Sequence, residues 1–372
     1  MKIQIIRRWA LVTAGVVLLC GLPVIASALP VSVPKLTAGQ LRTRIMASAD
    51  ESYAGYAESN ATFGLPPVAG LTGLTSLLNG VTKMRVWQAT PARWRVDVLS
   101  DAGERDTYQV SGYRSYIWDS GAQLLTEVRG RQTYRLPRPA DLVPPALALR
   151  MLSEAGRQAR LSVIAPLRVA GQSAAGLRVT PADPASTVGR VDIWADPSSG
   201  LPLMVEVFGR GSARPALESL FFQVSPWRPE PRVLTPARAA GTGFTVTRAS
   251  SLAGALRNVA LVALPAELAG RIRLPVQPGF ETIGAYGGGL TTFVVFAVRG
   301  SAGRKLVPDV VSAGGAPLII AGGAAAEISA PLINAIVVRP PGWLWTFLLA
   351  GTVSSQLLEQ AATDLTELVS LP

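Results

Sequence analysis

Three closely spaced carboxylates are the densest candidates for acid–base chemistry in this chain: Asp101, Glu104 and Asp106. Neighbouring carboxylates can act as general acid and general base when their environments separate their pKa values. These three surround Arg105 in a charged turn between two predicted strands, where charged side chains are ordinarily solvated. We therefore expect a polar turn at this position and not a catalytic site.

The other residue types that commonly carry catalysis are scarce. The chain contains no His, and its one Cys, Cys20, lies in an N-terminal leader. This composition excludes a Ser-His-Asp triad, and in the mature chain it excludes a Cys nucleophile and a Cys/His metal site. Asp192 and Asp196 flank a strand end and a turn, and they are also explained without catalysis. The sequence thus predicts a protein that is not an enzyme and needs no metal or cofactor.

The carboxylates lie within the most regular part of the sequence, which predicts an antiparallel sheet. From Met84 to Asp119, aromatic and β-branched residues alternate with charged ones between Gly and Asp turns. Alternation at period two gives a sheet one apolar face and one wet face. A curved sheet of this kind can hold an apolar molecule. Strands are predicted at 56–63, 82–88, 93–99, 105–110, 114–118, 122–128, 132–135, 160–169, 175–180, 189–195, 203–208 and 217–224.

Two helices are predicted to cover this sheet. The first is expected over 38–53, where a capping box precedes apolar residues at helical spacing, namely Leu41, Ile45, Ala49 and Tyr53. The second is expected over 146–156. Residues 64–80 carry no charge and are rich in Gly and Leu. Because solvent-exposed loops are rarely this apolar, we expect this segment to be a flap that packs on the sheet or contacts a lipid.

The residues expected to contact an apolar ligand come from this flap and from aromatic positions on the strands. Broad, rigid aromatic side chains suit acyl chains and leave few polar groups to satisfy. Core packing alone also explains the tryptophans, so both interpretations stay open. The candidates are Leu65, Leu71, Leu74, Leu77, Leu78, Trp87, Trp94, Trp118 and Trp194.

Composition divides the chain into a leader and two predicted domains, 29–248 and 249–372. Residues 1–28 have the features of an export signal or an uncleaved anchor, so the folded part is expected outside the cytoplasmic membrane, in the cell envelope. Removing the three leader charges from the formal +11 leaves +8, all of it between 29 and 248. This basic domain can attract an anionic membrane surface. Nucleic acid is not expected as a partner, because the basic residues alternate along strands.

The second predicted domain, 249–372, has equal numbers of acidic and basic residues and indicates a smaller α+β unit. We expect its helices, at 251–264, 302–312 and 355–369, to lie on one side of its sheet. Trp343 and Trp345 are expected to be exposed, which makes them candidates for contact with a partner protein.

Several motifs give residues 36–245 a resemblance to the LolA/LolB/RseB superfamily of exported lipoprotein-carrier and lipid-sensor domains. The resemblance is closest to the form found in high-GC Gram-positive bacteria, in which a second domain follows. It implies a curved antiparallel half-barrel covered by helices, with an apolar cavity for acyl chains. The motifs are the strand with Pro91, Arg93, Trp94 and Arg95, the segment from Gly112 to Asp119, Val179-Thr180-Pro181, and the segment from Val191 to Val207.

The resemblance implies two functions. One is a non-catalytic protein that binds a lipid or the acyl chains of a lipoprotein. The other is a regulator of the RseB type, which responds to envelope stress by binding a membrane anti-sigma factor through the C-terminal domain. In lipoprotein carriers an Arg directly before the proline that corresponds to Pro91 latches the helical lid. This chain has Thr90 at that position.

Overall fold

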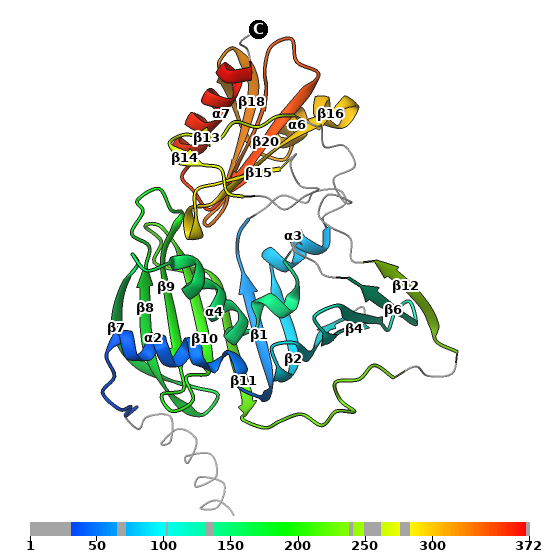
Figure 1. The fold of residues 1–372 in the computed structure, drawn as a ribbon, viewed down its shortest axis with the longest axis vertical. Coiled ribbons are helices and arrows are strands. Elements are labelled where there is room, and N and C mark those ends of the chain that lie inside the picture. Colours follow the sequence, from blue (N-terminus) through cyan, green and yellow to red (C-terminus); the bar gives the residue numbers. More distant parts are fainter. Residues whose placement is uncertain are drawn as a thin grey trace, which may run out of the picture.

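A computed structural model describes residues 31–64, 72–101, 103–130, 137–237, 241–248, 262–275 and 283–369. These residues form a sheet of twelve strands, a sheet of six strands and a two-stranded ribbon. Figure 1 shows the six-stranded sheet at one end of the larger sheet. The predicted export signal, the first half of the flap, the strand at 132–135 and most of the helix at 251–264 lie outside the described residues. Within the described ranges, no helix has the length and hydropathy needed to cross a membrane.

The twelve-stranded sheet consists of two meanders joined side by side. β11 pairs antiparallel with β1, which connects the meanders and leaves β7 at one edge of an open sheet. The predicted α+β fold with a large open antiparallel sheet is therefore confirmed. The first meander contains β1 (Tyr53–Ala61), β2 (Val81–Thr90), β3 (Arg93–Ser100), β4 (Gly103–Ser111), β5 (Arg114–Asp119) and β6 (Leu124–Arg129). The second contains β7 (Arg160–Val169), β8 (Gln172–Thr180), β9 (Val188–Ala195), β10 (Pro202–Gly209) and β11 (Pro215–Ser225).

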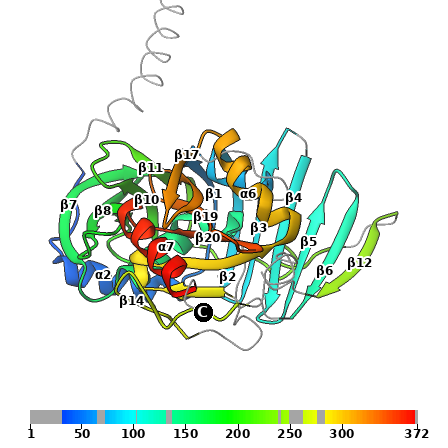
Figure 2. The same ribbon diagram turned by 90° about the horizontal axis from the view of Figure 1, so that it is seen from above.

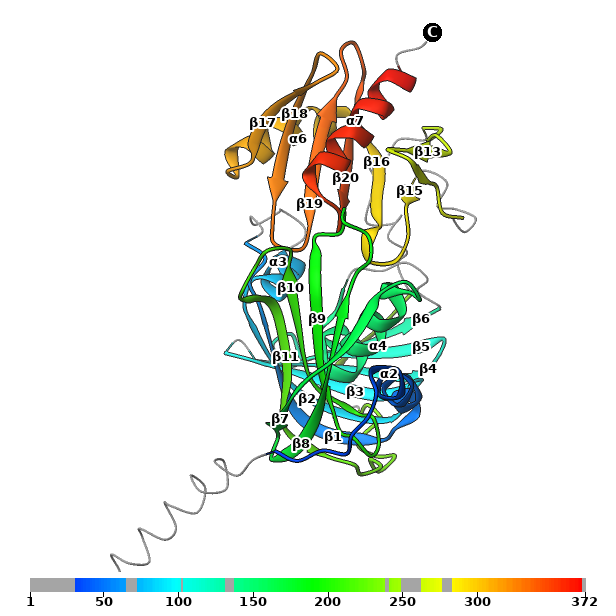
Figure 3. The same ribbon diagram turned by 90° about the vertical axis from the view of Figure 1, so that its left-hand side faces the viewer.

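Alternation along the strands decides which face of this sheet meets the helices. On β3, Trp94 points to the inner face and joins the main apolar core, whereas the neighbouring Arg95 points to the outer face. The core also contains Leu41 of α2 (Ala38–Ala47) and Leu147 of α4 (Pro144–Ala155). Figure 3 shows α2 and α4 together against this side of the sheet.

The outer face is crossed by residues 226–237, which we call the strap. The strap follows β11 and contributes the buried side chain of Leu234. The chain then forms β12 (Gly243–Arg248), which pairs parallel with β6 and completes the second edge of the sheet. Figure 2 shows β3 to β6 and then β12 fanning out to one side of the molecule.

The first helix is shorter than the sequence predicts. It ends at Ala47, and a 3-10 turn, η1 (Ser48–Asp50), separates it from β1, which begins at Tyr53. The side-chain amide of Gln88 donates to the carbonyls of Ala49 at 3.4 Å and Glu51 at 3.2 Å, which stabilises the reversal. Tyr53 fits the helical spacing of apolar residues, but in the structure it is the first residue of strand β1.

The six-stranded sheet has its own apolar cluster and is antiparallel throughout. Its order is β15-β16-β20-β19-β18-β17. The strands are β15 (Ile283–Tyr286), β16 (Phe293–Arg299), β17 (Ala316–Ile320), β18 (Gly323–Ser329), β19 (Asn334–Arg339) and β20 (Trp345–Gly351). The ribbon beside it contains β13 (Glu267–Leu268) and β14 (Arg271–Ile272).

The prediction that the helices lie on one side of this sheet is wrong. Phe347 of β20 packs in the cluster that contains Leu358 of α7 (Ser355–Val369). The next residue, Thr346, points to the opposite face and donates its hydroxyl to the carbonyl of Gly303 in α6 (Gly300–Ser312) at 2.7 Å. The two helices therefore cover opposite faces, as Figure 2 shows. The amphipathic pattern of a helix shows which side of the helix is buried, but it does not show which face of the sheet the helix packs against.

The two sheets contact each other through loops that carry both polar and apolar groups. The hydroxyls of Ser186 and Thr187 donate to the carbonyls of Leu290 at 2.9 Å and Leu332 at 2.7 Å. The side chains of both leucines belong to the main core of the larger sheet. Residues from the C-terminal part thus complete the packing of the N-terminal part.

One of these contacts involves the end of α4. The short turn η3 (Gly289–Thr291) begins at Gly289, whose φ is +57°. A Cβ atom at Gly289 would lie 2.0 Å from the carbonyl oxygen of Glu154, next to the last residue of α4. A side chain at this position would therefore separate η3 from the helix.

We predict that Gly289→Ala lowers the free energy of unfolding of the full chain more than Gly342→Ala does. Both glycines have positive φ, so each substitution carries a backbone cost of roughly 1 kcal/mol. Gly342 has no atom within 4 Å of the added Cβ, whereas Gly289 meets the α4 backbone. The clash should add about 1–3 kcal/mol. Urea denaturation measures both variants, and equal losses would contradict the tight contact.

Candidate functional site

A cavity of about 200 Å³ lies between the inner face of the sheet and the segment that leads into α4. Its floor is formed by β1, β2 and β3, through side chains that include Tyr53, Val86 and Trp94. Its cover is formed by η2 (Pro139–Leu142) and the start of α4, which we call the lid. The lid contributes Ala140 and Leu149, among others. The cavity is therefore mainly apolar and lies where the sequence resemblance places an acyl-chain site.

The lid is anchored to the sheet at one side of the cavity. The buried hydroxyl of Ser219 on β11 donates to the carbonyl of Leu142. Pro144 and Pro145 form the first turn of α4, where the missing amide hydrogen costs no helical hydrogen bond. These constraints fix the start of the helix above the strands.

A cation lies at the rim of the cavity. The Arg138 guanidinium stacks on the Trp94 ring, 4.8 Å from its centroid, and is 3.9 Å from the Asp141 carboxylate. The Asp141 carboxylate also accepts a hydrogen bond from the Arg138 backbone amide at 2.9 Å. The residue that caps the start of the lid thus supplies the cation, and the sheet supplies the aromatic ring. This contact connects the lid segment to the sheet.

The structure separates the predicted ligand-contacting residues. Trp94 lines the cavity, whereas Leu77 and Leu78 of α3 (Thr72–Leu78) are buried in the main core. Leu65 and Leu71 lie outside the described residues, as does the side chain of Leu74.

Of the remaining tryptophans of that set, Trp87 and Trp118 point to the outer face, whereas Trp194 is buried in the main core. Trp87 lies beneath Arg95, whose guanidinium is 5.0 Å from the ring centroid, and Trp118 pairs in register with Asp106. Trp194 lies over Gly176 and donates its indole N–H to the carbonyl of Ala165 at 3.0 Å. None of these three rings is part of the described cavity lining.

The two tryptophans proposed for partner contact lie next to each other. Trp343 and Trp345 form a T-shaped pair with ring centroids 5.1 Å apart, and both are half-buried. Leu344 between them is 75 % exposed. The apolar group that solvent reaches most readily in this loop is therefore Leu344.

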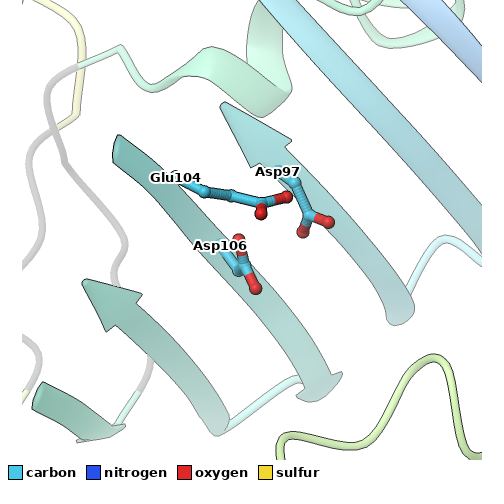
Figure 4. A group of neighbouring side chains, drawn as sticks. All are labelled: Asp97, Glu104 and Asp106. Carbon is cyan, nitrogen blue, oxygen red and sulfur yellow. The ribbon is translucent and has the colours of Figure 1, made fainter. Parts of the chain in front are cut away.

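The turn carboxylates singled out in the sequence are divided by the fold. Asp101 is exposed, whereas Asp106 is buried beside Asp97. Figure 4 shows Asp97, Glu104 and Asp106 directed toward one another, with carboxylate oxygens within 4.8 Å. Arg95 contacts both buried carboxylates, with its Nε 2.6 Å from Asp97 and its Nη2 2.9 Å from Asp106.

The charge of the two buried carboxylates, Asp97 and Asp106, is offset within the group. Arg95 offsets one carboxylate, and burial raises the pKa of Asp97 to about 7 although the contact with Arg95 opposes the shift. Asp97 Oδ2 and Asp106 Oδ1 are buried without a hydrogen-bond partner among the described residues. A proton on Asp97 would supply the donor that this pair lacks. The proximity of the carboxylates therefore needs neither a metal ion nor a catalytic role.

This group also holds the strap in place. The Arg95 guanidinium lies 4.8 Å from the Tyr108 ring centroid and donates to the carbonyl of Val233 in the strap at 3.5 Å. Tyr108 donates its hydroxyl to Asp106 at 3.2 Å. The buried ions therefore connect the strap to β3 and β4.

Sequence reasoning missed Asp97 and Arg138. The signal for Asp97 was present, because a two-residue hairpin turn after Ser100 places Asp97 opposite Asp106. No local pattern identifies Arg138, since its partner Trp94 is distant in the sequence. The two side chains are adjacent only because η2 packs over β3.

The chain was compared with known proteins. No family model matches it, and no curated protein matches it. Solved structures do match, and one is a chain of the Pseudomonas aeruginosa MucA/MucB complex. The two sequences are 18% identical, and the match covers 87% of this chain and 96% of that chain with a TM-score of 0.49. Another is a LolA superfamily protein of Nitrosomonas europaea, which is 13% identical. That match covers 54% of this chain and 99% of the other chain, with a TM-score of 0.25. These are the kinds of protein that the sequence resemblance names, and the likeness concerns the fold alone.

We predict that the stability of the protein falls as the pH rises from about 4 to about 7. The pKa of Asp97 is raised to about 7 by burial, and that of Glu206 is raised to about 7 by burial and by Glu218. Between these pH values the folded protein holds protons that the unfolded chain has lost. Each group therefore lowers the free energy of unfolding by up to about 1.4 kcal/mol per pH unit.

Urea denaturation across this range tests the assignment. Asp97→Asn should make the pH dependence less steep because its amide does not titrate, and adding Glu206→Gln should reduce it further. An unchanged slope in Asp97→Asn would show that Asp97 ionises normally in the folded protein.

Proposed function

We propose that this protein is an exported, non-catalytic lipid-binding protein that holds an acyl chain between the sheet and the lid. The observation that carries this proposal is the mainly apolar cavity beneath η2 and α4, with Trp94 on its floor and Arg138 at its rim. Burial of each methylene contributes about 0.8 kcal/mol, so an acyl chain binds tightly without specific polar contacts.

The lid must move for a whole acyl chain to enter. The cavity of about 200 Å³ is smaller than the about 300–1,000 Å³ that ligand pockets usually provide. The strands of the floor are fixed by ladders on both sides, whereas the lid is held by Ser219, by apolar packing and by the contact of Arg138 with Trp94. We infer that a lipid enters by displacing η2 and the start of α4.

Filling the cavity should abolish binding. Ala140→Phe places a ring in the space beneath the lid, so we expect the full-length protein to lose uptake of a fluorescent fatty acid at least tenfold. Ala47→Phe is the matched control, because Ala47 is exposed at the end of α2 and does not line the cavity. The measurement is fluorescence titration, with urea denaturation to verify that both variants fold. Undiminished uptake by folded Ala140→Phe protein would rule out this cavity as the site.

Weakening the contact between lid and sheet should accelerate entry. Arg138→Met keeps much of the side-chain stem and removes the cation above Trp94, a contact worth about 0.5–2 kcal/mol. We expect stopped-flow uptake of the same fatty acid to become several times faster. Arg150→Met is the control, because Arg150 lies on α4 but pairs with Glu154. Equal rates for wild type and Arg138→Met would show that this contact does not limit opening.

The second candidate function is regulation through a partner protein bound at the six-stranded sheet. The observation that favours it is the exposure of two large apolar side chains there, Ile319 at 83 % and Leu344 at 75 %. Under this proposal the partner is the exported segment of a membrane anti-sigma factor. Binding of such a purified segment to the full chain should be lost in Leu344→Lys, and unaffected binding would contradict this surface.

A further inference from the structure

A second pocket, of about 450 Å³, lies on the outer face of the sheet, beneath the strap. Its polar lining contains Arg93, Arg114, Tyr116 and Thr235. Its apolar lining comes from strand residues and from the strap, including Leu125 and Pro236. The volume lies within the range of about 300–1,000 Å³ that is usual for small-molecule sites.

The pocket has an excess of positive charge. Its described lining contains two arginines and no carboxylate. The neighbouring Glu127 lies 3.2 Å from Arg114 but is also 2.8 Å from Arg129, so two arginines share one carboxylate. No carboxylate of the described residues lies within 4.0 Å of Arg93. An anion is therefore the ligand that this charge distribution favours.

The donor set suits a phosphate group. Each guanidinium presents a planar fork of N–H donors that matches an oxyanion, and the hydroxyls of Tyr116 and Thr235 are further donors. A phosphate offers enough oxygens to accept from both forks at once. The apolar residues of the lining can contact the carbon atoms to which the phosphate is bonded.

The pocket and the cavity each have a lining residue at the turn between β2 and β3. Pro91 lines the cavity on the inner face, and Arg93 lines the pocket on the outer face. Two residues span at most about 7 Å of chain. Pro91 and Ala92 are exposed, so the turn is open to solvent between the two sites.

We propose that the pocket binds the phosphate headgroup of a lipid whose acyl chain occupies the cavity and whose glycerol part passes around this turn. The inference rests on the proposed function for its acyl chain and adds the lipid class, which is an anionic phospholipid. The cavity supplies affinity for the chain, and Arg93 and Arg114 select the headgroup.

The test compares two short-chain lipids with identical acyl chains, phosphatidylglycerol and diacylglycerol, on the full-length protein by calorimetry. We expect wild type to bind the phospholipid about ten times more tightly, because both guanidinium groups can donate charge-assisted hydrogen bonds to its phosphate. The double variant Arg93→Gln/Arg114→Gln should lose this preference and keep its affinity for diacylglycerol. The matched control, Arg157→Gln/Arg214→Gln, removes two exposed charges elsewhere and should keep the preference.

Each other outcome overturns a defined part of the proposal. Equal affinity of wild type for the two lipids removes the headgroup role and leaves the acyl-binding function standing. Equal losses in the two double variants show that surface charge in general attracts the lipid. If neither lipid binds, the proposed function fails. Inorganic phosphate alone distinguishes the sources of the anion, because binding of phosphate without lipid, lost in Arg93→Gln/Arg114→Gln, would make the pocket a site for free phosphate.

Discussion

The alternation of side chains along β3 is the constraint on which the rest of this structure depends. A strand places successive residues on opposite faces, so Trp94 faces the helices and Arg95 faces the strap. Both faces of the sheet are covered at this point, one by an apolar lid and the other by a polar segment. A one-residue shift in register would bury the Arg95 guanidinium in the main core and leave Trp94 beneath the strap. The cavity and the ion group are thus consequences of one register.

Helix α4 connects that local arrangement to the rest of the molecule. Its first turn covers the cavity, its middle packs in the main core through Leu147 and Leu152, and its end meets Gly289. Because Leu290 follows in the same core, displacement of the helix would disturb the C-terminal part as well. The two sheets have separate apolar clusters, and the contact of α4 with η3 joins the first cluster to the C-terminal part of the chain.

The sequence predicted the sheet well because its strands alternate regularly, and most predicted strands agree with the structure to within a few residues. It predicted the helix ends less well, since Tyr53 fits both a helical and a strand pattern and only its pairing with Gln88 of β2 decides between them. Trp87 and Trp94 are equivalent by type, yet register places them on opposite faces. Arg138 could not be found at all, because its contact with Trp94 exists only after the lid has closed over the sheet.

An apolar cavity by itself cannot distinguish one lipid from another with the same chains, because burial of methylenes depends on area alone. Discrimination therefore has to come from polar groups beyond the cavity. The strap provides a wall for such a site, and the strap is positioned by Arg95, the residue next to Trp94. The network of Arg95, Asp97 and Asp106 is consequently more than a way to bury charge. It helps to hold the wall of a basic pocket, and one residue of that pocket, Arg93, lies two positions from Pro91 of the apolar cavity.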